Sequence, residues 1–294
     1  MPGGDGTTVA VTGANRGIGL YTARWMADRG ASVVLLCRDA ASGEKARASL
    51  RRSANHRVVV CDLSVPDSVR AAAENVGQGS PLSGLVNNAA VLPRRRVIGP
   101  LGIELQMAVN HLGHFLLTRL LLPRLREPPT ARVVTVASRS HRGPAVDLGD
   151  PGFDVRRYTP LVAYQQSKMA NVAFTLALAR RLEGSTVKSL AVHPGVYGTD
   201  LLGGWTGLGP LVRFAVPGPK QGGRWVGSLA LGAGRTAVVP NGTYLEKGNR
   251  RMPAPAALDL DHQERLWRWS EGVLELDHWP PPEAGKSGVG HTRE

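Results

Sequence analysis

Short apolar runs alternate with longer amphipathic stretches over the first two-thirds of the chain. The stretches are of helical length, whereas the runs are rich in valine and leucine and short enough to be strands. Continuous apolar strands separated by helices predict a parallel sheet that helices cover on both faces. We therefore expect an α/β fold with a doubly wound parallel sheet of about seven strands. The expected strands are 9–11, 32–37, 57–61, 84–89, 132–137, 186–192 and 242–245, and the expected helices are 17–30, 40–53, 64–76, 101–125, 163–182, 221–231 and 261–273.

The sequence shows no internal repeat and no linker that would divide its 294 residues into two domains. We expect one domain over residues 1–278 and a disordered tail, rich in proline and glycine, over residues 279–294. Within the domain, residues 201–218 are rich in glycine, leucine and proline. This composition is typical of a mobile lid, which we expect at about 197–220. A helix pair used for packing or dimerisation fits the composition equally well.

The composition is that of a soluble globular protein, with 42% hydrophobic and 20% charged residues. No apolar run reaches the roughly 18 residues that span a bilayer, and the first residues lack an apolar secretory core. We therefore expect a cytoplasmic protein without a transmembrane anchor. Cys37 and Cys61 each end an apolar run, and we expect both to be buried and reduced.

The net charge of +13 does not by itself indicate a nucleic-acid partner. The arginines are spread along the chain, and the sequence has neither zinc-finger spacing nor a basic helix interleaved with aromatic residues. Nucleic acid is therefore not an expected partner. The abundance of arginine, alanine, glycine and proline is typical of a GC-rich genome and suggests a bacterial protein. A basic surface would also attract an anionic cofactor.

A glycine-rich turn follows the first expected strand and opens the first expected helix. Its glycines permit a tight turn, and the helix N-terminus offers N–H groups and a partial positive charge to an anion. The spacing is G-x-x-x-G-x-G rather than the common G-x-G-x-x-G, so a plain strand-to-helix turn remains an alternative. Its position favours a Rossmann-type fold that binds a dinucleotide pyrophosphate at this turn. The candidate residues are Gly13, Asn15, Arg16, Gly17, Ile18 and Gly19.

The residues after the second expected strand indicate which dinucleotide fits. An NAD enzyme commonly places a carboxylate there, whereas this chain has Arg38. Arg38 and Arg16 together could clamp a 2′-phosphate, which predicts NADP(H) as the cofactor. Asp39 comes one residue later and is expected to cap the next helix. The alternative is that Arg38 is only a solvated residue at the start of that helix.

Two further strand ends carry candidate cofactor-binding residues. Asp62, followed by Leu63, ends the third strand. Its carboxylate could accept a hydrogen bond from an adenine amine, or it could cap the helix that begins near Val65. Asn87 and Ala89 end the fourth strand, where small residues let a cofactor lie against the backbone.

A tyrosine and a lysine four residues apart form a candidate proton-transfer pair. Hydride that reaches a carbonyl carbon leaves an alkoxide, and Tyr164, with an ordinary pKa of about 10, could protonate it. Lys168 faces the same way one helical turn later, and we expect its charge to lower that pKa. Ser138, at the end of the fifth strand, could hydrogen-bond the substrate oxygen. Each of these patterns alone is common by chance.

Three histidines need no catalytic or metal-binding explanation. His111 and His114 flank a glycine on an expected helix and are predicted to be packed, hydrogen-bonded residues. His193 is predicted to orient the turn at Pro194. No metal site is indicated by the sequence.

Taken in order, these elements resemble the short-chain dehydrogenase/reductase superfamily over residues 7 to 275. In that family the tyrosine is the acid/base and the lysine also holds the nicotinamide ribose. The resemblance also implies that Asn110 supports a proton-relay water and that Thr199 hydrogen-bonds the nicotinamide carboxamide. The matching elements are Thr12 to Gly19, Asp62-Leu63, Asn87 to Ala90, Asn110, Ser138, Tyr164 with Lys168, and Pro194-Gly195 followed by Thr199. Ala90 and Gly198 depart from the usual residues at their positions.

The gap between Ser138 and Tyr164 is long for this superfamily, in which many members have a gap of about half that length. The extra residues form an insertion. We expect this insertion, residues 139–162, to form one wall of the substrate site. Together with the runs at 36–39 and 266–270, it resembles the retinol dehydrogenase-like branch. The resemblance implies NADPH-linked interconversion of apolar aldehydes or ketones with alcohols. It also suggests a homodimer or tetramer through the helices at 101–125 and 221–231, although this branch contains monomers.

Two other functions remain open at this point. The basic run at 94–96 could dock an acidic acyl carrier protein, which would make the chain a carrier-linked ketoreductase. The long insertion argues against that reading. The chain could also be a non-catalytic regulatory protein that binds NADPH, against which the intact serine, tyrosine and lysine argue. The sequence names neither the substrate nor the direction of the reaction.

Overall fold

The computed structural model describes residues 6–195 and 219–279, and its centre is one eight-stranded sheet in the order β3-β2-β1-β4-β5-β6-β7-β8. Neighbouring strands are parallel except for the β7–β8 pair. The predicted α/β fold is therefore confirmed. The sheet has one strand more than predicted, β8, which is only two residues long and too short to leave a pattern in the sequence. The strands are β1 Thr8–Thr12, β2 Ser32–Cys37, β3 Arg57–Val60, β4 Gly84–Asn87, β5 Ala131–Val136, β6 Val187–His193, β7 Tyr244–Glu246 and β8 Asn249–Arg250.

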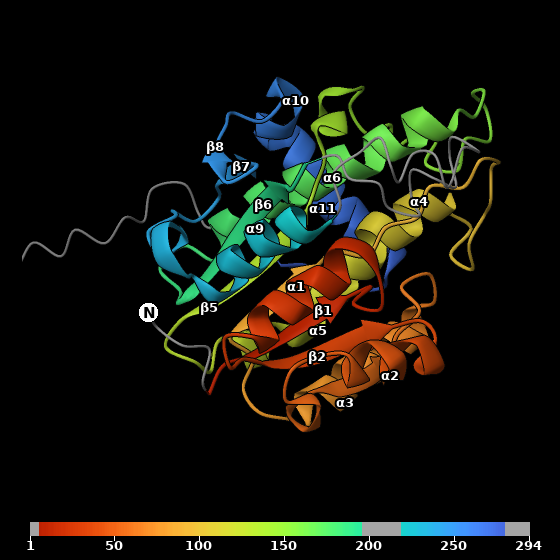
Figure 1. Cartoon of the computed structure of the whole chain (residues 1–294). Coiled ribbons are helices and arrows are strands. Elements are labelled where there is room, and N and C mark those ends of the chain that lie inside the picture. Colours follow the sequence, from red (N-terminus) through yellow and green to blue (C-terminus); the bar gives the residue numbers. More distant parts are fainter. Residues whose placement is uncertain (1–5, 196–218, 280–294) are drawn as a thin grey trace, which may run out of the picture.

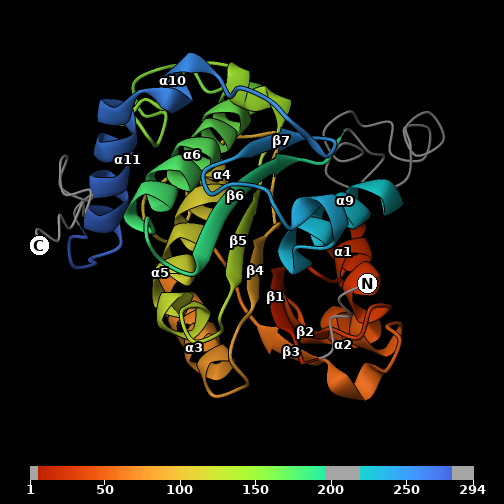
Figure 2. The same ribbon diagram turned by 90° about the vertical axis from the view of Figure 1, so that its left-hand side faces the viewer.

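Helices cover both faces of the sheet, as the two views show (Figures 1 and 2). One face carries α1 Gly17–Ala27, α2 Ala40–Ala48 and α9 Lys220–Leu231. The other carries α3 Pro66–Gly77, α5 Gly113–Leu125, α6 Pro160–Arg181 and α11 Leu260–Val273. The short elements are η1 Ser53–Asn55, α4 Leu105–Met107, η2 Ala108–Leu112, η3 Arg139–Arg142, η4 Gly234–Thr236 and α10 Pro255–Leu258. The carboxyl ends of the strands thus open between two helical layers, where such sheets bind ligands.

The two cysteines are both buried, as predicted, but they lie on opposite faces of the sheet. Cys37 belongs to the core under α1 and α2, whereas Cys61 belongs to the core under α3 and α5. Burial raises the pKa of Cys37 to about 11 and that of Cys61 to about 12. Both side chains are therefore protonated, inert hydrophobes.

The helix expected over 101–125 begins later and contains an irregular turn. Gly102 has φ +70°, which a helix does not accommodate, and Ile98 pairs with Glu104 instead. Glu104 then caps α4, since its carboxylate accepts hydrogen bonds from the N–H groups of Gln106 and Met107. Residues 108–112 form a single π turn before α5. Such turns are frequent at functional sites.

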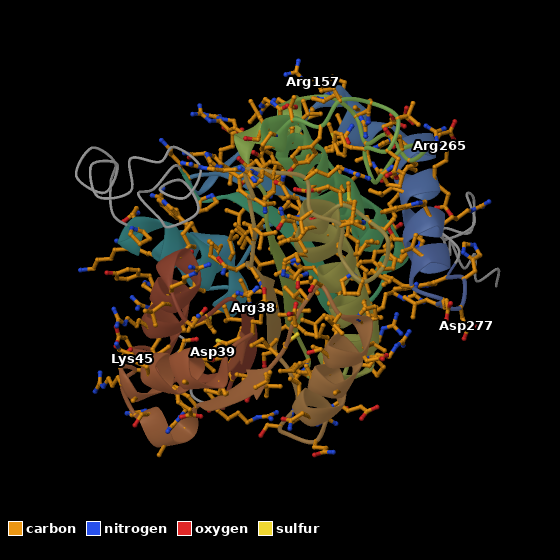
Figure 3. All side chains as sticks on the ribbon, turned by 90° about the vertical axis from the view of Figure 1, so that its right-hand side faces the viewer. Arg38, Asp39, Lys45, Arg157, Arg265 and Asp277 are labelled. Carbon is orange, nitrogen blue, oxygen red and sulfur yellow. The ribbon has the colours of Figure 1, made fainter. Side chains whose placement is uncertain are left out.

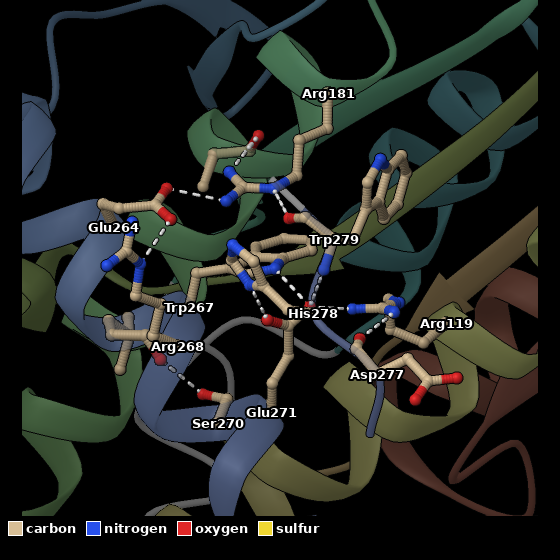
Figure 4. A network of polar contacts seen from close by, with 12 residues as sticks. Arg119, Arg181, Glu264, Trp267, Arg268, Ser270, Glu271, Asp277, His278 and Trp279 are labelled. Atoms are coloured by element: carbon tan, nitrogen blue, oxygen red, sulfur yellow. Dashed lines mark hydrogen bonds and ion pairs between the residues drawn. The ribbon is translucent and has the colours of Figure 1, made fainter. Parts of the chain in front are cut away.

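The end of the described chain is anchored on α5 and α6 by one buried carboxylate, shown in Figure 4. Glu271 accepts hydrogen bonds from Trp267 Nε1 at 2.7 Å, from Trp279 N at 2.9 Å and from Arg119. The Trp267 ring packs edge-on against Phe115 of α5, with ring centres 4.8 Å apart. Part of the helix predicted to make a subunit contact is therefore covered by the chain's own C-terminal helix. The homodimer stays a prediction.

Two expectations fall largely outside the described residues. The predicted lid at 197–220 coincides with residues 196–218, and the tail at 279–294 is described only at Trp279. Within residues 6–195 and 219–279, no helix is both long and apolar enough to cross a membrane.

Candidate active site

The glycine-rich turn folds as the sequence predicted, and its glycines are needed for two reasons. Gly13 and Gly17 have φ values of +63° and +53°, a region that side chains other than glycine rarely adopt. Gly19 is needed for space, because a Cβ there would lie 2.3 Å from the carbonyl oxygen of Gly13. The turn thereby presents the N-terminus of α1 to the pocket, where the first N–H groups of a helix can hold an anion.

A cavity of about 440 Å³ lies at the carboxyl ends of the first four strands. Its lining includes the glycine turn and residues 88–91, which contact each other where Gly13 meets Ala89. The predicted residues that line it are Gly13, Asn15, Arg16, Gly17, Ile18, Arg38, Asp62, Leu63 and Ala89. Sequence reasoning missed Ser42, Asn88, Val91, Leu105 and Val109, which also line it.

The residues after β2 give the cavity a basic end. Arg38 is exposed and lines the cavity, and Figure 3 shows it beside Asp39, with Lys45 of α2 farther out on the same side of the molecule. Asp39 caps α2 as predicted, since its carboxylate accepts a hydrogen bond from Ser42 N at 2.8 Å. These hydrogen bonds from Ser42 hold the pKa of Asp39 below its ordinary value. One oxygen of the Asp39 carboxylate is therefore used within the chain, and the residue also lines the cavity.

The third strand end also lies in the cavity wall. Asp62 accepts hydrogen bonds from the N–H and hydroxyl groups of Ser64, at 2.9 and 2.6 Å. The alternative that Asp62 caps α3 is wrong, because the N-cap is Val65 and has no side-chain cap. Leu63 packs against α5, where a Cβ on Gly113 would lie 2.3 Å from the Leu63 carbonyl oxygen. Adenine recognition by Asp62 stays a prediction.

At the fourth strand end, neighbouring asparagines point in different directions. Asn87 is buried and donates a hydrogen bond to Thr118 of α5, so its side chain lies behind the cavity. Asn88 lines the cavity, and its side-chain amide donates to the backbone carbonyl of Thr12 at 2.8 Å. Strand alternation places one of two adjacent residues on each face, and this rule could have identified Asn88 from the sequence. Any cofactor contact by Asn87 would use its backbone.

Asn110 joins the cavity wall to the helix that carries the proton-transfer pair. Its side chain donates to Ser167 of α6 at 3.0 Å and to the carbonyl of Val91 at 3.2 Å, and it accepts from Val91 N at 2.8 Å. Val91 lines the cavity, and Ser167 directly precedes Lys168. One amide side chain thus fixes α6 against the cofactor half of the site.

The predicted proton-transfer residues come together on α6 and at the end of β5. Lys168 Nζ lies 5.6 Å from the centre of the Tyr164 ring and donates to the carbonyl of Val136 at 3.0 Å. Ser138 acts on the Tyr164 phenol by lowering its pKa, and its hydroxyl accepts a hydrogen bond from Ser140 N at 3.1 Å. Side chains arranged in this way could hold a substrate oxygen atom by hydrogen bonds and donate a proton to it.

The electrostatics of this group differ from the prediction. Burial raises the pKa of Tyr164 to about 12, and the hydrogen bond from Ser138 only partly opposes that effect. Burial also lowers the pKa of Lys168 to about 8. In this form of the protein the pKa of Tyr164 therefore moves in the opposite direction from the predicted lowering, because loss of hydration is the largest effect on it. Tyr164 is a protonated acid at neutral pH.

The rate of the carbonyl reduction that the sequence predicts should depend on pH through Lys168. Its ammonium form, present below its pKa of about 8, would stabilise the tyrosinate that proton donation leaves behind. We expect kcat to be level below that pH and to fall about tenfold per pH unit above it. Steady-state rates across the pH range, compared with Lys168→Arg, test this. A wild-type profile that stayed level far above the Lys168 pKa would contradict it.

The insertion at 139–162 is folded onto the site by its own polar contacts. Asp150 accepts hydrogen bonds from Asp154 N at 2.6 Å and from Arg156 N at 3.1 Å. Tyr158 donates to the buried carboxylate of Glu104 at 3.3 Å. Arg96 donates to the carbonyl of Gly152 at 2.6 Å, so it is used within the chain rather than in a surface for an acidic carrier. The substrate wall stays a prediction.

The remaining predicted residues are placed as follows. His111 and His114 are buried and hydrogen-bonded, which confirms their packing role. Pro194 and Gly195 end the first described range, and Thr199 lies outside the described residues. Within residues 6–195 and 219–279, no three histidine, cysteine, aspartate or glutamate side chains are grouped to hold a metal ion.

Comparisons with known proteins point to one family. A family profile described as short chain dehydrogenase matches residues 7–206. Human retinol dehydrogenase 13 is 37% identical over 286 residues, covering 92% of this chain and 86% of the relative. Human retinol dehydrogenase 12 is 39% identical over 284 residues, covering 92% and 87%. A crystal structure of an uncharacterised protein from Mycobacterium paratuberculosis has a TM-score of 0.77 and 34% identity, covering 95% of this chain and 97% of the other.

Proposed function

The chain belongs to the short-chain dehydrogenase/reductase superfamily and its retinol dehydrogenase-like branch, and from this premise we propose an NADPH-dependent oxidoreductase that interconverts a carbonyl and an alcohol on a bulky, apolar substrate. The observation that carries the proposal is the bridge made by Asn110. It connects Val91 on the cavity wall to Ser167, between Tyr164 and Lys168. A dinucleotide cavity and a proton donor are thereby held in one rigid unit.

The residues present fit a nicotinamide dinucleotide. The cavity contains a glycine turn at a helix N-terminus for the pyrophosphate, and Arg16 and Arg38 for a 2′-phosphate. Asp39 is held by Ser42 at the start of α2, which leaves no carboxylate committed to the ribose hydroxyls at that strand end. These features support NADP(H) rather than NAD(H).

The choice of cofactor should be reversible through one residue. Arg38→Asp removes a cation that would pair with the 2′-phosphate and adds a repulsive charge, so we expect kcat/KM for NADPH to fall about 100-fold, whereas that for NADH changes little. Lys45→Asp is the matched control, because it makes the same charge change on exposed α2 outside the cavity lining. Equal losses of kcat/KM for NADPH in the two variants would mean that NADPH is selected by the overall electrostatic field of the protein and not by a contact with Arg38.

In the mechanism, bound NADPH would supply the hydride. Ser138 and Tyr164 would hold the substrate oxygen between their hydroxyl groups. Tyr164, protonated because burial raises its pKa to about 12, would donate its proton to the developing alkoxide. Lys168 would stabilise the resulting tyrosinate, and Asn110 would keep α6 in register with the cavity. Alcohol oxidation would use the same groups in reverse.

The first test is NADPH and NADH oxidation by the purified chain with a panel of apolar aldehydes and ketones. The proposal predicts turnover of at least one bulky, apolar carbonyl with NADPH and a much lower rate with NADH. Tight NADPH binding without turnover of any carbonyl would instead support the regulatory alternative.

A further inference from the structure

His114 is a buried imidazole that the proposed mechanism does not use, although both of its nitrogens contact groups of the site. It lies in the first turn of α5 and is 1% exposed. Nδ1 is 3.0 Å from the carbonyl oxygen of Asn110, within the π turn. Nε2 is 2.8 Å from the hydroxyl oxygen of Thr12, the residue before Gly13. One side chain therefore spans the space between the proton-transfer helix and the glycine turn.

The chemistry of the partners fixes the direction of every hydrogen bond. A carbonyl oxygen can only accept, so Nδ1 of His114 must carry the proton and donate to Asn110. Nε2 is then an acceptor, and the Thr12 hydroxyl donates to it. The Thr12 oxygen in turn accepts from Asn88 N at 2.8 Å and from Ala89 N at 3.0 Å. One tautomer and one hydroxyl orientation satisfy the contacts of His114 with Asn110 and Thr12, whereas the Thr12 hydroxyl, which also lies 3.3 Å from the Val86 carbonyl oxygen, cannot donate to that oxygen at the same time.

These contacts reach both halves of the site. Asn88 and Ala89 line the cavity, and the Asn110 side chain holds Val91 and Ser167. The π turn is the irregular part of its helix, with five buried residues. The hydrogen bond from His114 to the Asn110 carbonyl fixes the backbone of this turn relative to α5.

The imidazole is neutral in this position. Burial lowers the pKa of His114 to about 4, and repulsion by the Lys168 ammonium acts in the same direction. His111 also faces it, and burial lowers the pKa of that group to about 3. A neutral ring leaves the Lys168 charge available to Tyr164, whereas a second buried cation beside Lys168 would be repelled.

We propose that His114 is a positioning residue, which locks the Asn110 carbonyl and the Thr12 hydroxyl in one geometry so that the cofactor cavity and the proton donor stay aligned. The proposal rests on the proposed carbonyl reductase function. It assigns His114 no contact with substrate or cofactor. Its effect is on the alignment of the reacting groups, where a displacement of about 1 Å can cost about 100-fold in rate.

The kinetic test uses three substitutions that divide the two contacts. His114→Asn places an amide nitrogen where Nδ1 was, and His114→Gln places an amide oxygen where Nε2 was. His114→Phe fills the space with neither contact. We expect kcat to fall about 100-fold in the phenylalanine variant with little change in the KM for NADPH, and to recover by about tenfold or more in the asparagine variant. A phenylalanine variant that lost thermal stability but kept wild-type kcat would overturn the proposal.

A second measurement does not depend on turnover or on the phenylalanine variant folding. Nitrogen-15 NMR of the imidazoles in the wild-type chain should show His114 with a protonated Nδ1 and an unprotonated Nε2, unchanged across neutral pH. The opposite tautomer, or titration near the ordinary pKa of about 6.5, would overturn the positioning claim directly. If no carbonyl were reduced, the proposed function would fail, and the tautomer alone would decide the claim about His114.

Discussion

Replacing Tyr164 with phenylalanine is expected to lower kcat for carbonyl reduction about 1,000-fold while the affinity for NADPH is retained. The phenol is the proposed proton donor, since burial raises its pKa to about 12 and keeps it protonated at neutral pH. Phenylalanine has the same ring and leaves the α6 packing in place. The loss should therefore appear in kcat and not in the melting temperature or in the dissociation constant for NADPH.

The matched control is Tyr21→Phe. Tyr21 is also partly buried, but it lies on α1, where it packs near Gly223 of α9 and outside the cavity lining. We expect this variant to keep wild-type kcat. Residual turnover of more than about a tenth in Tyr164→Phe would show that another group supplies the proton.

The largest expected effect on stability comes from Glu271→Gln. The Glu271 side chain is 4% exposed and pairs with Arg119, which is 15% exposed, and with His278. Burial alone would raise the pKa of Glu271, but hydrogen bonds from His278, Trp279, Arg119 and Trp267 outweigh it and hold the pKa below its ordinary value. Loss of the charge leaves a buried guanidinium without its partner, at a cost of about 3 kcal/mol.

In a chain of this size, a loss of that magnitude should lower the melting temperature by about 6–10 °C. Scanning calorimetry on both proteins measures it. Glu44→Gln is the control, because Glu44 is 53% exposed and pairs with Arg47 on α2, and such surface pairs contribute about 0–1 kcal/mol. An equal shift in both variants would show that the anchor of the C-terminal segment is no stronger than a surface ion pair.

The sequence predicted the elements whose residues carry local signals. The glycine turn was found because Gly13 and Gly17 adopt positive φ and because a helix follows directly. Asp39 was recognised as a cap because capping depends on a side chain and the N–H three residues later. The alternation of apolar strands and helices was sufficient for the doubly wound sheet.

The sequence could not predict what depends on the packing of distant segments. The pKa of Tyr164 follows from burial among several elements, so the spacing to Lys168 alone gave the wrong direction. The bridge from His114 to Thr12 joins residues 102 positions apart. The π turn at 108–112 has no periodic signal, because it changes the helix by a single extra residue.

The most direct test of the central claim is to follow a deuterium label from the cofactor to the product. The purified chain would be incubated with an apolar ketone and NADPH deuterated at the transferable C4 position, and the alcohol analysed by mass spectrometry. We expect one deuterium on the carbinol carbon in the wild type and formation of the same alcohol about 1,000-fold more slowly with Tyr164→Phe. An unlabelled alcohol, or equal labelled product from both proteins, would contradict this expectation.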